Sequence, residues 1–191
     1  MKTSPVGLDD LQGVFAQPRL VRHEAGEIDW GESQKEIEIF ARQGVTRFIY
    51  GGDALSGVAL EPFRKLTTWL QGFPKNLWAI PGVGPDWGLA VEQAQVLSQR
   101  FFPCVLLLPG AEFPELGTWE QNVRSLHQIA KKPLALALRS PFDLGTDPEA
   151  ALQSVLRLMR EGVILFVWCA DASVGEWAAR VLDARRIVFG A

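Results

Sequence analysis

Residues 105–110 read Val-Leu-Leu-Leu-Pro-Gly and show the pattern that decides the fold. Four consecutive apolar side chains leave no polar face, so a strand of this composition is buried on both sides. Pro109 and Gly110 then favour a turn. Residues 164–169 repeat the pattern near the end of the chain. Such strands are typical of parallel sheets that helices cover on both faces.

Short apolar runs of this kind alternate along the chain with longer segments at helical spacing. The expected strands cover residues 11–15, 48–50, 77–80, 105–108, 134–138, 164–169 and 187–189. The expected helices cover residues 30–43, 61–70, 87–101, 118–130, 148–161 and 174–182. We expect Asp29 and Thr118 to cap the helices that they precede or begin, because short polar side chains accept hydrogen bonds from the first free N–H groups. Asp147-Pro148-Glu149 should open the helix that runs to Glu161. The alternation predicts an α/β fold.

Composition excludes several classes of protein. The chain has 191 residues, of which 48% are hydrophobic and 21% charged, so it can bury a core and we expect one domain over residues 1–191. A net charge of −3 gives no basic footprint for nucleic acid. No apolar run approaches the roughly 20 residues of a membrane span. Residues 1–10 lack the pattern of a secretory signal, which favours a cytoplasmic protein.

Cysteine and histidine usage points away from disulfides and metals. Cys104 and Cys169 each lie inside an apolar run, as buried thiols do in a reducing compartment. The two histidines, His23 and His127, have no paired spacing that would suit a metal ion. Residues 82–88, Gly-Val-Gly-Pro-Asp-Trp-Gly, only approach a dinucleotide-binding motif. We therefore expect neither a metal nor another cofactor.

Two architectures fit the order of elements: a (β/α) barrel and an open doubly wound sheet. Length favours the open sheet, because a complete barrel takes about 250 residues. Local sequence favours the barrel. The segments that carry this second signal are GVFAQP at 13–18, IDW at 28–30, ARQGV at 41–45, FIYGGDALS at 48–56, LEPFRKL at 60–66, IPGVG at 80–84 and LLLP at 106–109. In this order they resemble the dihydrodipicolinate synthase and N-acetylneuraminate lyase family of Schiff-base aldolases, although no single motif is intact.

The resemblance covers about residues 11–190 and implies a (β/α)8 TIM barrel with its site at the carboxyl ends of the strands. Residues 186–191 resemble the seventh strand of the family. We therefore expect an incomplete barrel of about seven parallel strands and six helices, either as a fragment of a longer chain or with its edge covered. Open edges at 11–15 and 187–189 would then favour a homo-oligomer or a partner chain.

The resemblance also implies which catalytic residues are missing. The family forms an imine on a lysine of the sixth strand, but Lys132 is the last lysine of this chain. Ala170 or Cys169 takes the lysine position. The family's proton-relay tyrosine belongs at the end of the fifth strand, where Ala137 or Leu138 stands.

The second strand departs from the family as well. Tyr50 is the only tyrosine and lies on this strand, so it cannot replace the missing relay. Gly52 and Asp53 stand where the resemblance implies two threonines that bind the carboxylate of a 2-keto acid. Gly52 offers no hydroxyl, and Asp53 would repel that carboxylate by more than about 1 kcal/mol in a partly dry cleft.

Other side chains near strand ends could build a different site. Asp53 either binds a cation or a hydroxyl group, or caps the next turn. Asp171 is either a site carboxylate or an N-cap, and Arg139 either meets an anion or stays solvated or ion-paired. Cys169 could be a nucleophile, but its neighbours offer no cation to lower its pKa. Trp168 is placed to fill the barrel mouth.

These observations support one leading hypothesis and two alternatives. The leading one is a lyase-family relative that has lost Schiff-base chemistry, a pseudoenzyme candidate that could still bind a small carbonyl or hydroxy compound. The first alternative is an active lyase or another enzyme that uses Asp53, Arg139 and Asp171. The second is a structural partner of a complete family member. An open polar cavity at the strand ends would favour an enzyme, and a mouth filled by Trp168 would favour the leading hypothesis.

Overall fold

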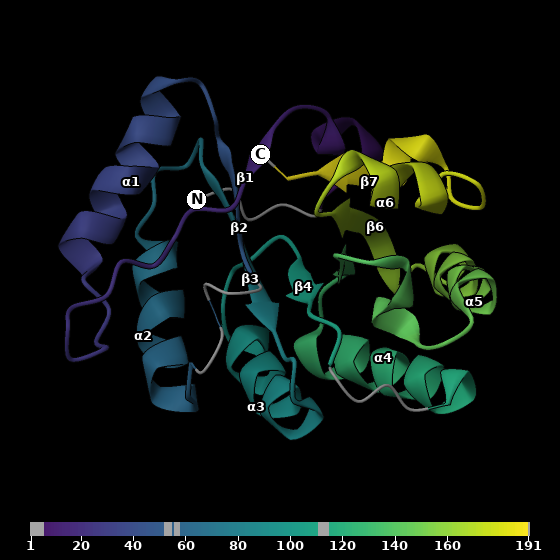
Figure 1. The fold of residues 1–191 in the computed structure, drawn as a ribbon. Coiled ribbons are helices and arrows are strands. Elements are labelled where there is room, and N and C mark those ends of the chain that lie inside the picture. Colours follow the sequence, from purple (N-terminus) through teal and green to yellow (C-terminus); the bar gives the residue numbers. More distant parts are fainter. Residues whose placement is uncertain (1–5, 52–54, 56–57, 111–114, 191) are drawn as a thin grey trace.

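The computed structural model of the protein describes residues 6–51, 55, 58–110 and 115–190. Within them, seven strands form one parallel sheet in chain order, β1 to β7. The strands are β1 (Phe15–Ala16), β2 (Arg47–Tyr50), β3 (Trp78–Val83), β4 (Val105–Leu107), β5 (Leu134–Leu138), β6 (Ile164–Cys169) and β7 (Ile187–Phe189). Figure 1 shows them curling around a common centre. The fold is an incomplete (β/α)8 barrel that is nearly closed.

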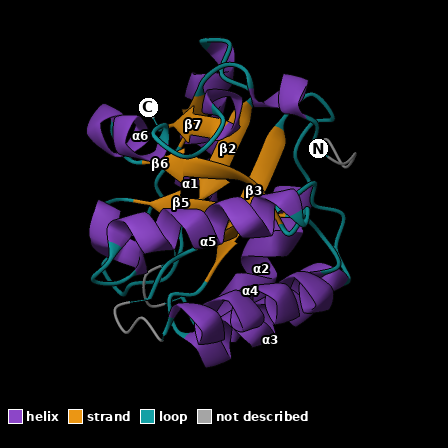
Figure 2. Cartoon of the chain, turned by 90° about the vertical axis from the view of Figure 1, so that its right-hand side faces the viewer, coloured by secondary structure: helices purple, strands orange, loops and turns teal. Residues whose placement is uncertain are grey.

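Helices surround the strands on the outside (Figures 1 and 2). The α-helices in the described residues are α1 (Trp30–Arg42), α2 (Leu60–Gln71), α3 (Trp87–Ser98), α4 (Leu116–Ala130), α5 (Pro148–Arg160) and α6 (Ala172–Ala178). None of these helices has both the length and the apolar composition to cross a membrane. Parallel neighbours need a crossover connection, and each of these helices supplies one. The strand order β1 to β7 follows the chain, as in a barrel, so the open doubly wound sheet favoured by chain length is wrong.

Aromatic side chains fill the interior of the barrel. The ring of Phe15 lies 6.2 Å from that of Trp78 and 5.9 Å from that of Phe166, so β1, β3 and β6 meet across the centre. The Arg47 guanidinium stacks on both Phe15 and Trp78. Phe15 and Phe166 are fully buried. The barrel is a packed core, as the side-chain layers of this architecture require.

Several expected bounds shift for local reasons. The expected strand 11–15 begins only at Phe15, because Gly13 has a φ of +105° and turns the backbone out of the extended conformation. Residues 8–11 form a 3-10 helix instead. In contrast, β3 continues past Ile80 to Val83. Gly82 is needed there, since a Cβ would lie 2.7 Å from the Tyr50 carbonyl oxygen.

Helix caps show which local signals decide a helix end. Asp29 and Asp147 cap α1 and α5, accepting backbone hydrogen bonds from Glu32 and Ala150. The expected cap at Thr118 is wrong, because α4 begins two residues earlier, after Glu115. The helices α3 and α6 end at Ser98 and Ala178, earlier than their apolar patterns indicate.

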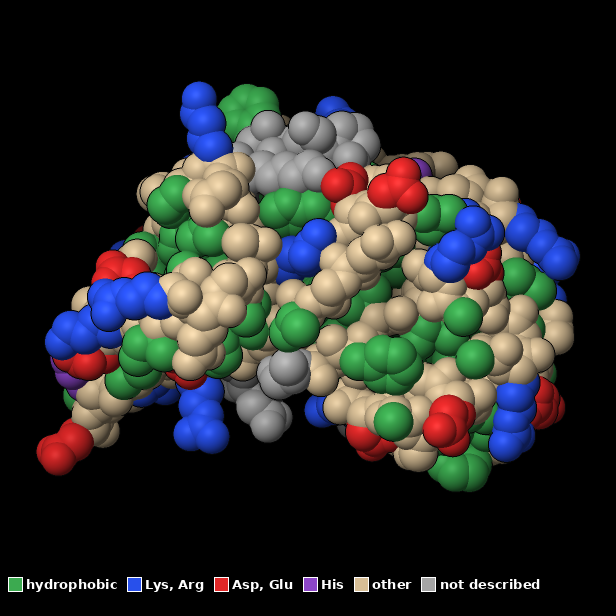
Figure 3. Space-filling model, turned by 90° about the horizontal axis from the view of Figure 1, so that it is seen from above, with side chains coloured by type: hydrophobic (Ala, Val, Ile, Leu, Met, Phe, Trp, Pro, Cys, Tyr) green, Lys and Arg blue, Asp and Glu red, His purple; other side chains and the backbone are tan. Residues whose placement is uncertain are grey.

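The edge between β1 and β7 is closer to closure than we expected. A parallel bridge joins Phe15 of β1 to Gly190, the residue after β7. The expectation that both strands lack a partner is therefore wrong at the position of this bridge. Below the bridge, segments 8–14 and 184–190 line a cleft of about 550 Å³. Val14 is 50% exposed and Phe189 is 47% exposed beside it. Figure 3, drawn from this side, shows hydrophobic side chains exposed among charged ones. We call this region the seam.

Candidate functional site

The carboxyl ends of the strands form the face on which barrel enzymes carry their sites. At the centre of this face, Trp168 of β6 lies in register with Ala137 of β5 and Val188 of β7. Residues paired in register point to the same side of a sheet, so these three side chains share one interior layer. Trp168 is only 7% exposed. The expectation that it fills the barrel mouth is confirmed.

The backbone around Trp168 is shaped to admit the indole. A Cβ on Gly190 would lie 2.6 Å from Cζ2 of Trp168, so only glycine leaves the ring its place. Ala137, the register partner on the other side, adds a single methyl group. Two small neighbours and one large side chain therefore occupy the centre of the face together, as close packing requires.

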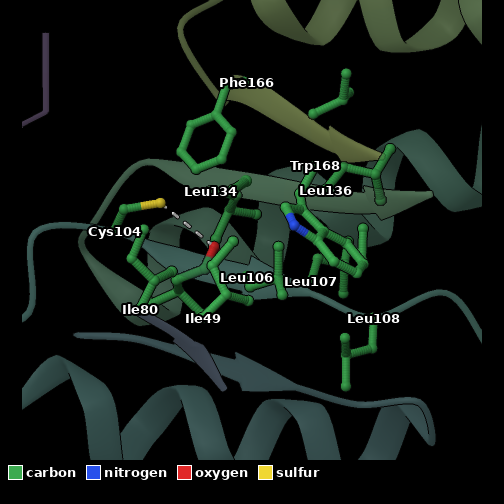
Figure 4. Packing of buried hydrophobic residues seen from close by; sticks show 14 of the residues in the cluster. Ile49, Ile80, Cys104, Leu106, Leu107, Leu108, Leu134, Leu136, Phe166 and Trp168 are labelled. Carbon is green, nitrogen blue, oxygen red and sulfur yellow. Dashed lines mark hydrogen bonds between the residues drawn. The ribbon is translucent and has the colours of Figure 1, made fainter. Parts of the chain in front are cut away.

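Leucine side chains fill the other half of the mouth. A Cβ on Gly51, which follows β2, would lie 2.7 Å from Leu106 and 3.0 Å from Leu108. Figure 4 shows the Trp168 indole reaching from β6 toward the side on which Leu106 and Leu108 lie. Gln17 crosses from the end of β1 and donates a hydrogen bond of 2.5 Å to the Gly51 carbonyl. The layer combines apolar packing with one polar contact between strand ends.

The positions that the resemblance assigned to the lysine offer no nucleophile. Ala170 is exposed and has no functional group. The Cys169 thiol is buried, and burial, followed by the nearby charge of Asp171, raises its pKa to about 12. At neutral pH a thiol with such a pKa stays protonated and is a weak nucleophile. Cys169 does not replace the lysine.

The positions assigned to the tyrosine are equally inert. Ala137 and Leu138 are both buried apolar side chains. Tyr50 faces the helices instead, with its ring 6.0 Å from that of Trp69 on α2. Burial, and then the charge of Glu36, raises the pKa of the Tyr50 phenol well above its usual value. Tyr50 therefore neither lies at the mouth nor exchanges protons readily.

Among the described residues, Asp171 and Arg139 are the remaining predicted ones, and they do not line the same cavity. Asp171 is the N-cap of α6, where one carboxylate oxygen accepts hydrogen bonds from the Val174 backbone at 3.0 Å and the Ser173 hydroxyl at 2.7 Å. These bonds lower its pKa. Its structural alternative is thus confirmed. Gly52 and Asp53 lie outside the described residues.

Arg139 lies in a cavity beside the mouth. This cavity, which we call the β5 cavity, has a volume of about 810 Å³ and is lined from the ends of β3, β4 and β5. Three carboxylates that sequence reasoning missed, Glu115, Asp143 and Asp147, line it together with Arg139. Asp147 was expected at the start of a helix, but nothing local indicated that the three loops converge. The structure does not bring Asp171 into this group of lining residues.

The glycine-rich turn after β3 satisfies itself. The Gly84 backbone N–H donates to the buried side chain of Gln93 at 2.9 Å, and Asp86 caps α3. A phosphate at this turn would need free backbone N–H groups. The N–H of Gly84 and the N–H of Leu89, which donates to Asp86, are both already bound within the chain. Within residues 6–51, 55, 58–110 and 115–190, no three metal-ligating side chains gather closely enough to hold an ion.

Comparison with solved structures gives a consistent fold. The 4-hydroxy-tetrahydrodipicolinate synthase of Methylacidiphilum fumariolicum superposes with a TM-score of 0.74 over 94% of this chain, at 17% identity. The 2-keto 3-deoxygluconate aldolase of Picrophilus torridus gives 0.76 over 93%, at 12% identity. Dihydrodipicolinate synthase of Aquifex aeolicus gives 0.73 over 94%, at 15% identity.

This chain has the barrel fold of these lyases. It spans 61%, 65% and 63% of their respective lengths. No protein-family model and no curated protein sequence matches it. At such identities the likeness extends to the fold alone, and each site residue has to be judged on its own contacts.

Proposed function

We propose that this protein is a divergent member of the dihydrodipicolinate synthase and N-acetylneuraminate lyase family that lacks Schiff-base aldolase activity. The barrel shared with lyases of this group supports the family. One observation carries the loss of activity: the layer in which a lysine and a tyrosine would work contains Trp168 and Ala137, which are buried and lie in register on β6 and β5. Without a lysine amine in this layer no imine can form there, and without a tyrosine phenol no proton can be relayed to or from the substrate.

The test is trapping with borohydride in the presence of pyruvate, read by intact mass. Borohydride reduces an imine to a stable amine, so any Schiff base adds a fixed mass to the chain. We expect no adduct on this protein under conditions that label a complete dihydrodipicolinate synthase fully. A stable stoichiometric adduct mapped to any one of the six lysines would refute the proposal, because it would show that another amine of this chain forms the imine.

The seam favours a second candidate, a structural partner of a complete family member. Val14 and Phe189 are about half exposed at an edge where a single bridge joins β1 to β7. Monomeric proteins seldom leave apolar side chains grouped at an unpaired sheet edge. Mixing this chain with a complete family enzyme and following the mass of the species by light scattering tests this candidate. Unchanged masses of both components would rule it out.

A further inference from the structure

The end of the barrel opposite the candidate site carries a group of positive charges. Three consecutive connections lead from a helix into a strand there: residues 72–77 before β3, 99–104 before β4 and 131–133 before β5. They contain three lysines and one arginine, and no aspartate or glutamate. Because the amino ends of the strands of a parallel barrel all lie at one end, the three connections form one surface. We call it the amino face.

Contacts between neighbouring elements bring these connections together. The Val105 backbone N–H donates to the Pro133 carbonyl at 3.1 Å, which ties the start of β4 to the start of β5. The Arg100 guanidinium donates to Oε1 of Gln71 at 3.0 Å and so joins the end of α3 to the end of α2. Figures 1 and 2 show α3 and α4 side by side. Arg100 and Lys131, which follow these two helices, therefore belong to the same part of the amino face.

The charges of the amino face are not neutralised by carboxylates. Burial, and then the charge of Lys131, lowers the pKa of Lys132, so two neighbouring ammonium groups repel each other. Glu161 in the next connection along the sheet already binds Arg124 with both carboxylate oxygens, at 2.7 and 2.8 Å. An anionic partner would relieve the repulsion. The cations of this face, which make no ion pair within the described part of the chain, are Lys75, Arg100, Lys131 and Lys132.

An apolar side chain projects among these cations. Phe101 directly follows Arg100 and is 73% exposed. The next residue, Phe102, is only 3% exposed, and Pro103 is buried as well. These buried neighbours hold the connection in place, so the Phe101 ring stays directed to solvent. The amino face thus combines a projecting ring with a border of positive charge.

We infer that the amino face binds the surface of an anionic lipid bilayer, with Phe101 inserted among the headgroups and the four cations paired with their anionic groups. An apolar side chain bordered by lysine and arginine is typical of protein surfaces that lie on membranes. Long cationic side chains can reach the headgroups while the ring enters the acyl boundary. Such contact needs no membrane-spanning helix.

The side chains of the amino face favour lipid over nucleic acid. Three of its four cations are lysines, which act as hydrated point charges. The guanidinium of Arg100 is already engaged by Gln71, whereas nucleic-acid surfaces depend on free arginine forks and on several rings that stack with bases. The inference goes beyond the proposed function, because the missing lysine and tyrosine belong to the opposite end of the barrel.

Co-sedimentation of the full chain with vesicles tests the inference. One set of vesicles contains phosphatidylserine and phosphatidylcholine in equal parts, and the other contains phosphatidylcholine alone. We expect the chain to bind the mixed vesicles at least about tenfold more strongly at low ionic strength, since several cations near an anionic surface act together. Added salt should weaken this binding, because it screens exposed charges.

Variants identify the surface that is used. Lys131→Gln with Lys132→Gln should weaken binding to mixed vesicles about tenfold, because two of the four cations are lost. Arg64→Gln with Lys65→Gln is the matched control, since these two exposed cations are also adjacent but lie within α2, and it should change binding clearly less.

A dye at the projecting ring separates insertion from electrostatic attraction. Cys104 and Cys169 are buried, so a nitrobenzoxadiazole label on the Phe101→Cys variant reacts at the substituted position. Its fluorescence should rise with mixed vesicles and stay unchanged with phosphatidylcholine alone. The same label on Phe142→Cys, at the opposite end of the barrel and 67% exposed in the unaltered chain, should not respond. A label at position 101 that does not respond would overturn the proposed insertion.

Three further results would overturn the inference as a whole: mixed vesicles bind no better than phosphatidylcholine, the control pair on α2 weakens binding as much as the lysine pair, or a single-stranded oligonucleotide or polyglutamate binds more tightly than the mixed vesicles. The last result would assign the face to a nucleic acid or an acidic protein. Unchanged melting temperatures show that the variants fold. If a variant unfolds, the order of vesicles and polyanions on the unaltered protein still decides. Borohydride trapping reports separately on the proposed loss of chemistry.

Discussion

The barrel mouth and the β5 cavity lie on the same face of the molecule but differ in what their side chains leave open. In the mouth, Trp168 takes the room that Gly190 and Ala137 give up. Among the described residues, the lysine and tyrosine positions hold no group that exchanges a proton near neutral pH. In the cavity, Arg139 and Glu115 remain accessible. The comparison teaches that the order of the strands determines which face could hold a site. A few side chains that point into the barrel then decide whether the centre of that face has room for a ligand.

The largest effect should come from removing the indole that fills the mouth. Trp168→Ala deletes a side chain that is only 7% exposed and should lower the free energy of unfolding by about 3 to 5 kcal/mol, because the cavity left behind cannot collapse fully. Urea denaturation measures this. Trp168→Phe retains most of the volume and should lose clearly less. A loss below about 1 kcal/mol for Trp168→Ala would mean that the indole does not pack the mouth.

Gly190→Ala tests the same packing from the backbone. The new Cβ would lie 2.6 Å from the Trp168 ring, so the indole must shift, which should lower stability by about 1 to 3 kcal/mol. Gly117→Ala on α4 is the matched control, because a Cβ there meets nothing within 4 Å and alanine favours a helix. Equal melting temperatures for the two variants would contradict the packing.

Outside the face, a charged network joins α4 to α5 and gives a pH-dependent comparison. Glu120 is buried and binds Arg157 and Arg124, the latter at 3.0 Å. Burial raises the pKa of Glu120, but the hydrogen bonds from Arg157, Ser154 and Arg124 outweigh it, so the pKa is lowered. A lowered folded-state pKa contributes stability that is present above the unfolded pKa and lost as the pH falls through the folded one.

Glu120→Gln should therefore lower stability by about 1 to 2 kcal/mol at pH 7, since both arginines are partly exposed. The difference from the unaltered protein should begin to shrink as the pH falls below the ordinary glutamate pKa of about 4.3, and should be lost as the pH passes through the lower folded-state pKa of Glu120. Glu32→Gln, which removes an exposed pair with Lys35, should change stability by less than about 0.5 kcal/mol. Denaturation curves at pH 7 and below pH 4 test this, and a constant difference would contradict it.

Substitutions at the seam should have the smallest effect on folding. They should nevertheless change the association of the chain clearly. Light scattering across a dilution series should show that the unaltered chain self-associates. Val14→Ser with Phe189→Ser should reduce association by exposing hydroxyl groups in place of apolar surface. Ile39→Ser on α1 removes a side chain that is 54% exposed elsewhere and should not. If the unaltered protein is strictly monomeric across the dilution series, the prediction of association through the seam is wrong.

The sequence predicted most of the strands. On the strand-end face it predicted the filled barrel mouth but not the β5 cavity. Strands β5, β6 and β7 match their expected bounds, because continuous apolar runs end at strong turn signals. The barrel itself came from ordered motif resemblance, against the argument from length. Trp168 could be placed in the mouth because it lies one or two residues before the lysine position, which is Cys169 or Ala170.

The β5 cavity could not be predicted in the same way. Glu115 belongs to the connection after β4, and Asp143 and Asp147 belong to the connection after β5, and no periodicity indicates that these two segments meet. Asp143 is fixed by backbone N–H groups of Arg139 and Ser140, a contact that depends on the turn after β5. Gly13 likewise opens the seam through its positive φ, which a strand pattern does not reveal.

A single titration tests the filled mouth directly. The side-chain N–H signal of the Trp168 indole, which is only 7% exposed, can be followed in a proton–nitrogen correlation spectrum while pyruvate is added. The account predicts that this signal stays unchanged. A Trp168 signal that shifts in a saturable way with pyruvate would contradict the account, because the centre of the mouth would then be a working site.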